Sequence, residues 1–242
     1  TGVHSPYRIG IDEISSSLSD LVEVMKALKS PYYENKEIDT IFDELVRLYW
    51  LRPENALFRF VEARILYKYL DKYLIYPMLD MGCGEGLFTS VLFGAKVNEA
   101  YDNYESVNAQ KNDPYNNYVK VPEDFLVNKP FPIGSGIDFK ESSVKKARDL
   151  CVYDSVEQGD VRDMPYENGQ FNSIFSNMVN DIQENDLEKV FCEVRRVLKK
   201  EGYFVFTTPN ENFLDCMYYH NKKELSDVGR FDKGRSEWVP RA

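Results

Sequence analysis

The sequence has few histidines and cysteines, and it lacks a long apolar run. Its two histidines are far apart and its four cysteines show no Cys-x-x-Cys spacing, so the pattern disfavours a zinc site. No stretch approaches the ~20 apolar residues of a membrane-spanning helix, and the first residues lack the pattern of a secretory signal peptide. We therefore expect a protein with no metal and no membrane span, located in the reducing cytoplasm.

An excess of basic residues is also missing. The 242 residues include 30 lysines and arginines against 40 aspartates and glutamates, a formal net charge of −10. Because nucleic-acid-binding proteins usually present a basic face to phosphates, we expect no nucleic-acid partner. The chain does have an apolar content of 43%, enough for a core, and 17 tyrosines, which can stack on sugars or line a small-molecule pocket.

The apolar pattern changes at about residue 77. Before it, helical periodicity is found at 12–29 and 36–50, and a third helix is expected after Pro53, a residue that suits a first helical turn. After it, strands and helices alternate, which is typical of a parallel sheet with crossover helices. We expect strands near 78–81, 133–138, 153–158, 171–176 and 202–208, and helices near 86–93, 140–150 and 185–199. The predicted fold is α/β, a doubly wound, mostly parallel Rossmann-like sheet with an N-terminal helical cap at 1–76.

The most informative segment joins the first expected strand to the first helix of this alternation. Asp80 ends the strand, and Gly82, Gly84 and Gly86 follow at every second position. Backbone without Cβ atoms lets a ligand approach closely. A dinucleotide fingerprint, G-x-G-x-x-G, would require a glycine where Leu87 stands, so the spacing disfavours NAD and FAD.

This turn, with an acid two residues before it, resembles motif I of the class I S-adenosylmethionine (SAM) dependent methyltransferases. Four later segments resemble motifs of the same family in the same order: Ile137–Phe139, Glu157–Tyr166, Phe171–Asn177 and Val194–Pro209. The resemblance covers residues 77–214. It implies a SAM-binding Rossmann-like domain there, followed by a C-terminal tail at 215–242.

The resemblance also assigns residues to the cofactor. In this family the turn that follows the first acid, here Asp80, leaves room for the amino-acid end of SAM. The turn in this chain is Gly82–Gly86, with Cys83 inside it. A carboxylate that closes the second strand binds both ribose hydroxyls, and its counterpart here is Asp138, followed by Phe139.

Two later segments complete the expected site. By resemblance, Asp160 and the backbone N–H of Val161 contact the adenine edge, and Asn177 follows the fourth strand. From the residues alone, a turn-forming or capping role for Asp160 is an equal alternative. Relatives often carry a histidine after the fourth strand, and this chain has none there. Asp181 and His220 are weak candidates for a general base, which is optional because much of the acceleration can come from positioning.

A long insertion separates the turn from the second expected strand. Asp138 follows Gly82 by 56 positions (138 − 82 = 56), whereas about 20 is usual in a nucleotide-binding βαβ unit. The excess at about 95–132 is either a lid that contacts substrate, which we favour, or a surface loop. Asp102 is a rival for the ribose acid because its spacing is closer to the usual value, but the segment 96–102 is too polar for a central strand. We therefore choose Asp138.

These features predict transfer of a methyl group from SAM to a small-molecule or sugar acceptor, at oxygen. The helical lead and the insertion resemble methyltransferases of bacterial surface-glycan gene clusters, which favours a glycan. The alternatives are a non-catalytic SAM-binding partner subunit, or a protein or RNA methyltransferase. We find no convincing strand pair after about residue 209, where the family has one. The incomplete sheet edge would leave room for a homodimer.

Overall fold

A computed structural model describes residues 36–50, 53–102, 118–129, 132–208, 230–232 and 237–239. The chain divides into two compact units, Thr1–Tyr67 and Lys68–Ala242, and each is described by itself. The helix expected at 12–29 and the candidate base His220 lie outside the described residues. The division into a cap at 1–76, a domain at 77–214 and a tail at 215–242 stays a prediction.

The described part of the first unit contains two helices where the periodicity predicts them. Helix α2 spans Lys36–Leu48 and α3 spans Pro53–Leu66, beginning at the expected proline. The rings of Phe42 and Phe60 meet edge to face, with their centroids 5.0 Å apart, and so join the two helices. The buried stripe of α2 recurs every three or four residues, as an amphipathic helix requires: Ile38, Ile41, Leu45 and Leu48.

The second unit is built on a five-stranded sheet, as the alternating pattern predicts. Its strands are β1 (Met78–Met81), β4 (Ser135–Asp138), β5 (Ser155–Gln158), β6 (Phe171–Ser176) and β7 (Leu198–Phe206). Their order is β5-β4-β1-β6-β7 and every neighbouring pair is parallel. The chain moves outward from β1 in one direction and then in the other. Ligands in such sheets bind at the carboxyl ends of the strands, where the order reverses.

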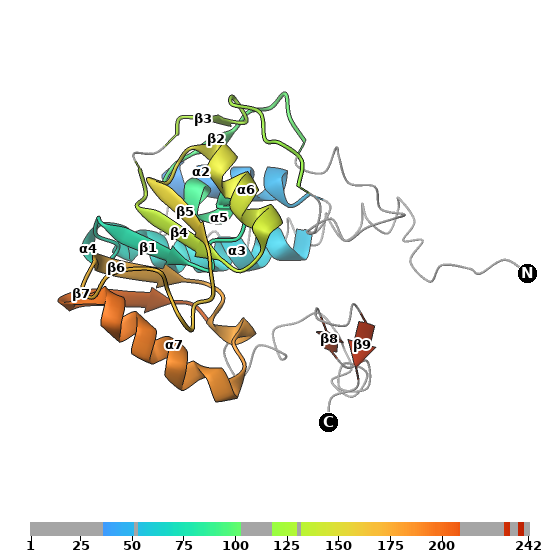
Figure 1. The fold of residues 1–242 in the computed structure, drawn as a ribbon. Coiled ribbons are helices and arrows are strands. Elements are labelled where there is room, and N and C mark those ends of the chain that lie inside the picture. Colours follow the sequence, from blue (N-terminus) through green and yellow to red (C-terminus); the bar gives the residue numbers. More distant parts are fainter. Residues whose placement is uncertain are drawn as a thin grey trace, which may run out of the picture. The chain divides into compact units, whose positions relative to one another are not determined.

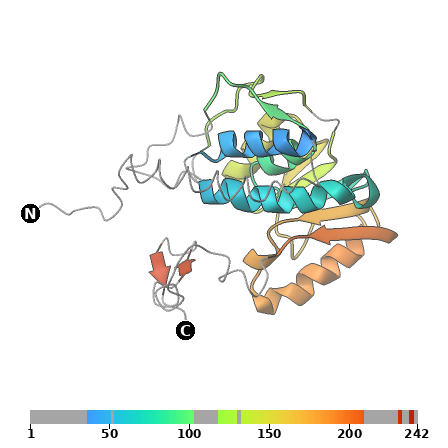
Figure 2. The same ribbon diagram turned by 180° about the vertical axis from the view of Figure 1, so that it is seen from behind.

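Helices cover both faces of the sheet, which confirms the doubly wound arrangement (Figures 1 and 2). Helix α7 (Glu184–Val197) lies on one face, and α5 (Leu87–Leu92) and α6 (Glu141–Leu150) lie on the other. All four residues of β1 are buried because helices pack above and below it. None of the helices in the described part is long and apolar enough to cross a membrane.

The insertion contributes a ribbon of its own rather than a strand of the main sheet. Strands β2 (Lys96–Val97) and β3 (Leu126–Val127) pair only with each other, antiparallel (Figure 1). The polar segment that begins at Lys96 is therefore not a central strand, as its composition predicts. Residues 103–117 lie outside the described part of the chain.

The C-terminal region corrects one expectation. Strands β8 (Arg230–Asp232) and β9 (Glu237–Val239) form an antiparallel pair, so the prediction that this region holds no strand pair is wrong. Each strand has only three residues. An alternation of polar and apolar side chains cannot be recognised over so short a run, because period-2 patterns need four or more residues.

Candidate functional site

The glycine turn closes directly over the carboxyl end of β4. The backbone N–H groups of Gly82 and Cys83 both donate to the carbonyl of Ile137, at 2.8 and 3.0 Å. All three glycines of the turn have positive φ, with Gly84 at +56°, a conformation that residues with a Cβ adopt at a cost. The turn is thereby locked between β1 and β4, at the place where the sheet topology predicts a ligand.

The three glycines differ in what lies above them. A Cβ added at Gly82 would collide with the side chain of Met178, and one at Gly86 would lie 2.8 Å from the ring of Tyr153. A Cβ at Gly84 would have no described atom within 4 Å. Gly84 is therefore the part of the turn whose backbone a bound molecule can reach.

Asp138 meets this turn from the end of β4. Its Oδ2 accepts a hydrogen bond from the backbone N–H of Gly84 at 2.8 Å, and its Oδ1 accepts one from Lys140 N–H at 2.8 Å. A carboxylate has about four acceptor positions, so it retains capacity for a vicinal diol. Asp102 lies instead in the insertion, beyond β2. Phe139, which follows Asp138 in the chain, is 78% exposed and offers an apolar ring next to the carboxylate of Asp138.

Asp80 lies beneath the turn rather than at its surface. It is 2% exposed, and its Oδ2 accepts a 2.6 Å hydrogen bond from the hydroxyl of Tyr153. Burial, reinforced by Asp80 and Cys83, holds the pKa of Tyr153 well above its ordinary value. Burial, followed by the charges of Asp80 and Asp138, likewise raises the pKa of Cys83. The Cys83 side chain is therefore a neutral thiol and not a nucleophile.

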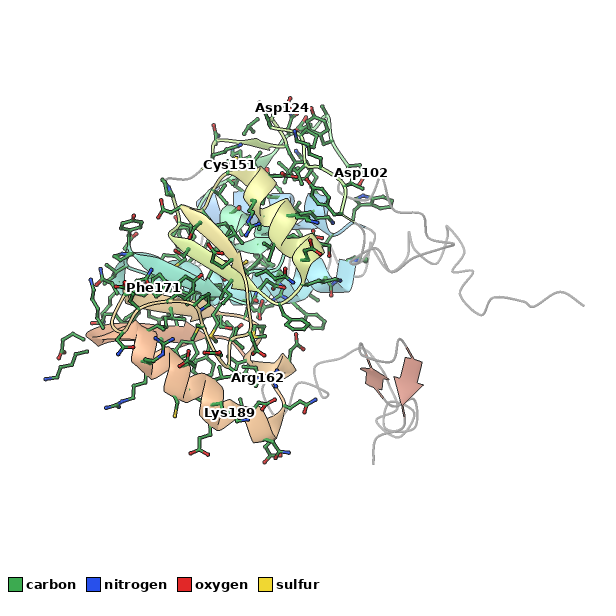
Figure 3. The ribbon with its side chains drawn as sticks, viewed as in Figure 1. Asp102, Asp124, Cys151, Arg162, Phe171 and Lys189 are labelled. Carbon is green, nitrogen blue, oxygen red and sulfur yellow. The ribbon has the colours of Figure 1, made fainter. Side chains whose placement is uncertain are left out.

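Asp160 follows β5 and is held by an arginine that the sequence pattern did not predict. Nε of Arg162 lies 2.9 Å from its Oδ1, and Nη2 lies 2.6 Å from its Oδ2. Nη1 of the same arginine donates to Asp186 on α7 at 2.8 Å (Figure 3, Arg162). The hydrogen bonds from Arg162 lower the pKa of Asp160, so it is a carboxylate at neutral pH. Val161 beside it packs against the apolar core.

The segment after β6 brings a methionine over the glycine turn. Asn177 and Met178 follow the strand and lead into a short 3-10 helix, Val179–Asp181. The backbone N–H of Met178 donates to the hydroxyl of Ser176 at 3.3 Å, and the side chain of Met178 reaches Gly82. Asp181, the weak candidate base, is exposed at the end of this helix.

The groups at the carboxyl ends of β1 and β4 suit SAM. Two carboxylates, Asp80 and Asp138, lie at the ends of neighbouring strands, and a positively charged sulfonium is stabilised by nearby negative charge. Gly84 supplies the open backbone, Asp138 supplies acceptors for a diol, and Phe139 supplies an apolar ring. Within the described ranges, no group of three His, Cys, Asp or Glu side chains is arranged to hold a metal ion.

A family comparison agrees with this geometry. Residues 129–206 match the family described as Methyltransferase domain. This segment of the chain is therefore similar to a methyltransferase domain. The matched segment includes strands β4 to β7 and, with them, Asp138, Asp160 and Asn177. The cofactor of such a domain is SAM.

Solved structures similar to this chain include several methyltransferases. The PH0226 protein from Pyrococcus horikoshii is 25% identical, with 60% of this chain and 54% of that chain covered and a TM-score of 0.37. A putative SAM-dependent methyltransferase from Methanococcus maripaludis is 17% identical, with coverages of 76% and 70% and a TM-score of 0.41. A SAM-dependent methyltransferase from Archaeoglobus fulgidus is 16% identical, with coverages of 64% and 54% and a TM-score of 0.41.

The chain spans about half the length of the first solved structures that it matches, at 54% and 53%. A search of curated proteins finds no match.

Proposed function

We propose that the protein transfers the methyl group of SAM to a hydroxyl oxygen of a small-molecule or sugar acceptor. The observation that carries the proposal is the 2.8 Å hydrogen bond from the N–H of Gly84 to Asp138. It joins the open glycine of the turn to the strand-end carboxylate, the two features that a nucleoside with an amino-acid tail would contact together.

Each part of the cofactor has a partner in this proposal. The amino-acid end lies over Gly84, the ribose diol lies on Asp138, and the adenine lies between Phe139 and the Asp160–Val161 segment. Arg162 neutralises much of the charge of Asp160. Adenine is uncharged, so its amino group needs only one acceptor position of that carboxylate.

The chemistry needs positioning more than it needs a special group. When bound, SAM supplies a methyl group on a positively charged sulfur, and transfer forms a carbon–oxygen bond as the carbon–sulfur bond breaks. Holding the acceptor in line with that bond provides much of the acceleration. The exposed carboxylate of Asp181 is the described candidate for taking the hydroxyl proton, since it follows the strand next to the turn.

The acceptor class is chosen from charge and composition. A net charge of −10 disfavours nucleic-acid acceptors, and 17 tyrosines suit a small hydroxylated molecule. The resemblance to methyltransferases of surface-glycan gene clusters favours a sugar.

Two measurements on the purified protein test the proposal. Calorimetric titration with SAM and with S-adenosylhomocysteine is expected to show saturable binding of both. Transfer of a labelled methyl group is then followed over a panel of nucleotide sugars and cell glycans, with Asp138→Ala as the inactive control. Binding of SAM without transfer to any acceptor would favour the non-catalytic subunit, and labelling of protein or RNA would contradict the choice of acceptor.

A further inference from the structure

A second cavity, of about 280 Å³, lies between the glycine turn, helix α6 and the insertion. Its lining includes Glu85 and Leu87 from the turn and the start of α5, Lys146 and Leu150 from α6, and Tyr101 and Phe125 from the insertion. Asp102, the rival for the ribose acid in the sequence, also lines this cavity. Glu85 of the glycine turn lines the cavity, whereas Gly84 and Asp138 are not among its lining residues.

The inner wall of the cavity is apolar and partly aromatic. Leu87, Phe125 and Leu150 are all buried. The ring of Tyr101 packs against that of Phe125, with centroids 6.1 Å apart and planes 31° apart. Such a surface suits the C–H face of a flat ring, because aromatic side chains provide a large apolar contact area.

Four charged residues supply the polar part of the lining: Asp102, Lys120 and the ion pair of Glu85 with Lys146. Nζ of Lys146 lies 2.6 Å from Oε1 of Glu85, and the side chains are only 16% and 21% exposed. An ammonium has three donors and a carboxylate about four acceptor positions. The bond between Lys146 and Glu85 uses one of each, so the pair retains further donors and further acceptor positions. The pair has no net charge, so it gives little net attraction to a charged ligand. It is better suited to a neutral ligand whose groups both donate and accept hydrogen bonds. Hydroxyl groups have that property.

The outer wall of the cavity is held by specific hydrogen bonds. Oδ2 of Asp149 on α6 accepts bonds from the hydroxyl of Tyr118 at 2.8 Å and from the backbone N–H of Val121 at 3.0 Å. The hydroxyl of Tyr101 donates to Oδ1 of Asp124 at 2.6 Å (Figure 3, Asp124). These bonds tie both described ends of the insertion into the wall, as in ligand sites that are formed before binding.

We propose that this cavity binds one neutral saccharide ring and is a subsite for the acceptor. The proposal rests on the proposed transfer to a sugar hydroxyl. The volume of about 280 Å³ lies just below the ~300–1,000 Å³ range of ligand pockets, which fits one ring better than a chain. The ring would place a C–H face against Tyr101 and its hydroxyls on Glu85 and Lys146. The insertion would thus have a binding role rather than that of a surface loop.

Binding of methyl glycosides tests the subsite directly. The probes are the methyl glycosides of glucose, galactose and N-acetylglucosamine, with benzoate as a charged ring, followed by saturation-transfer NMR in the presence of S-adenosylhomocysteine. We expect at least one glycoside to bind and benzoate not to bind. Lys146→Met should weaken glycoside binding about tenfold or more, as for a lost hydrogen bond to a charged group. Val119→Trp should abolish it by filling the cavity at an exposed lining position.

A lysine on another helix provides the matched control. Lys189 on α7 pairs with Asp186 and does not line the cavity, so Lys189→Met should bind glycosides as the wild type does. Calorimetry with SAM on every variant shows that the cofactor site is intact. Absence of glycoside binding in a wild type that binds SAM would overturn the subsite, as would preference for benzoate or wild-type binding by both cavity variants.

The subsite and the proposed function fail in different assays. Glycan methylation that is unchanged in Lys146→Met and Val119→Trp would remove the subsite and leave the function. Glycoside binding that is lost in both variants, in a protein that methylates no glycan, would support a saccharide site and overturn the proposed transfer.

Discussion

Replacing one glycine of the turn separates a folding effect from a binding effect. Gly84 has φ of +56°, and a Cβ there would have no described atom within 4 Å. Gly169, in the turn before β6, has φ of +64° and the same open surroundings. Gly84→Ala and Gly169→Ala therefore impose the same kind of backbone strain without a packing clash, but only the first adds a methyl group to the proposed SAM crevice.

The expected magnitudes follow from these positions. A left-handed conformation costs a residue with a Cβ about 1–2 kcal/mol, and each kcal/mol lowers Tm by roughly 2–4 °C in a domain of this size. Both variants should lose this much stability. At Gly84 the new methyl group also holds the ligand away from the backbone, so we expect the affinity for SAM to fall by more than about tenfold, or about 1.4 kcal/mol.

Thermal denaturation and calorimetric titration with SAM, run on both variants, check this prediction. Gly169→Ala should show a lowered Tm and wild-type affinity, and Gly84→Ala should show a lowered Tm and weak binding. Wild-type affinity in both variants would mean that the open face of Gly84 is not where SAM lies. An equal loss of affinity in both variants would mean that backbone strain alone weakens binding, and that the methyl group added at Gly84 does not keep SAM away.

Three further changes test other parts of the site. Asp138→Ala should weaken SAM binding by ~1.5–3 kcal/mol, the value of hydrogen bonds to a charged group, whereas Asp102→Ala should leave calorimetric affinity unchanged; the reverse result would exchange their roles. Tyr153→Phe should lower the free energy of unfolding in urea by about 1–3 kcal/mol, because it leaves the buried carboxylate at the end of β1 without that donor; wild-type stability would contradict the importance of this bond. Arg162→Met should lower stability above pH ~4, since Arg162 depresses the pKa of Asp160 in the folded state only. The difference from wild type should disappear as the pH falls through that depressed pKa, and a pH-independent difference in urea titrations would exclude this linkage.

The sheet could be predicted from the sequence because its strands are buried on both faces. Apolar residues fill three of the four positions of Met78–Met81 and three of the six of Phe171–Ser176, and the structure has strands at those bounds. The expected strand at 202–208 begins earlier, at Leu198. The register shift between Phe171 and Ser173 accommodates this earlier start, which is an effect of pairing that no local pattern encodes.

The choice of Asp138 over Asp102 as the strand-end acid also came from composition. A central strand has to be apolar on both sides, and only the segment before Asp138 meets that requirement. The structure places that acid on β4, beside β1, and places β2 in a separate ribbon. Its role in binding ribose stays a prediction.

The sequence by itself determined the succession of strands and helices along the chain, the glycine turn and the acid that would face it. These features depend on local periodicity and on residues without a side chain. Only the tertiary structure decided that Arg162 donates to Asp186 on α7, that Tyr153 donates to Asp80, and that Glu85 and Lys146 line one cavity. The physical reason is separation along the chain. Tyr153 and Asp80 are 73 positions apart, and such pairs meet only when the packing of helices against the sheet brings their elements together.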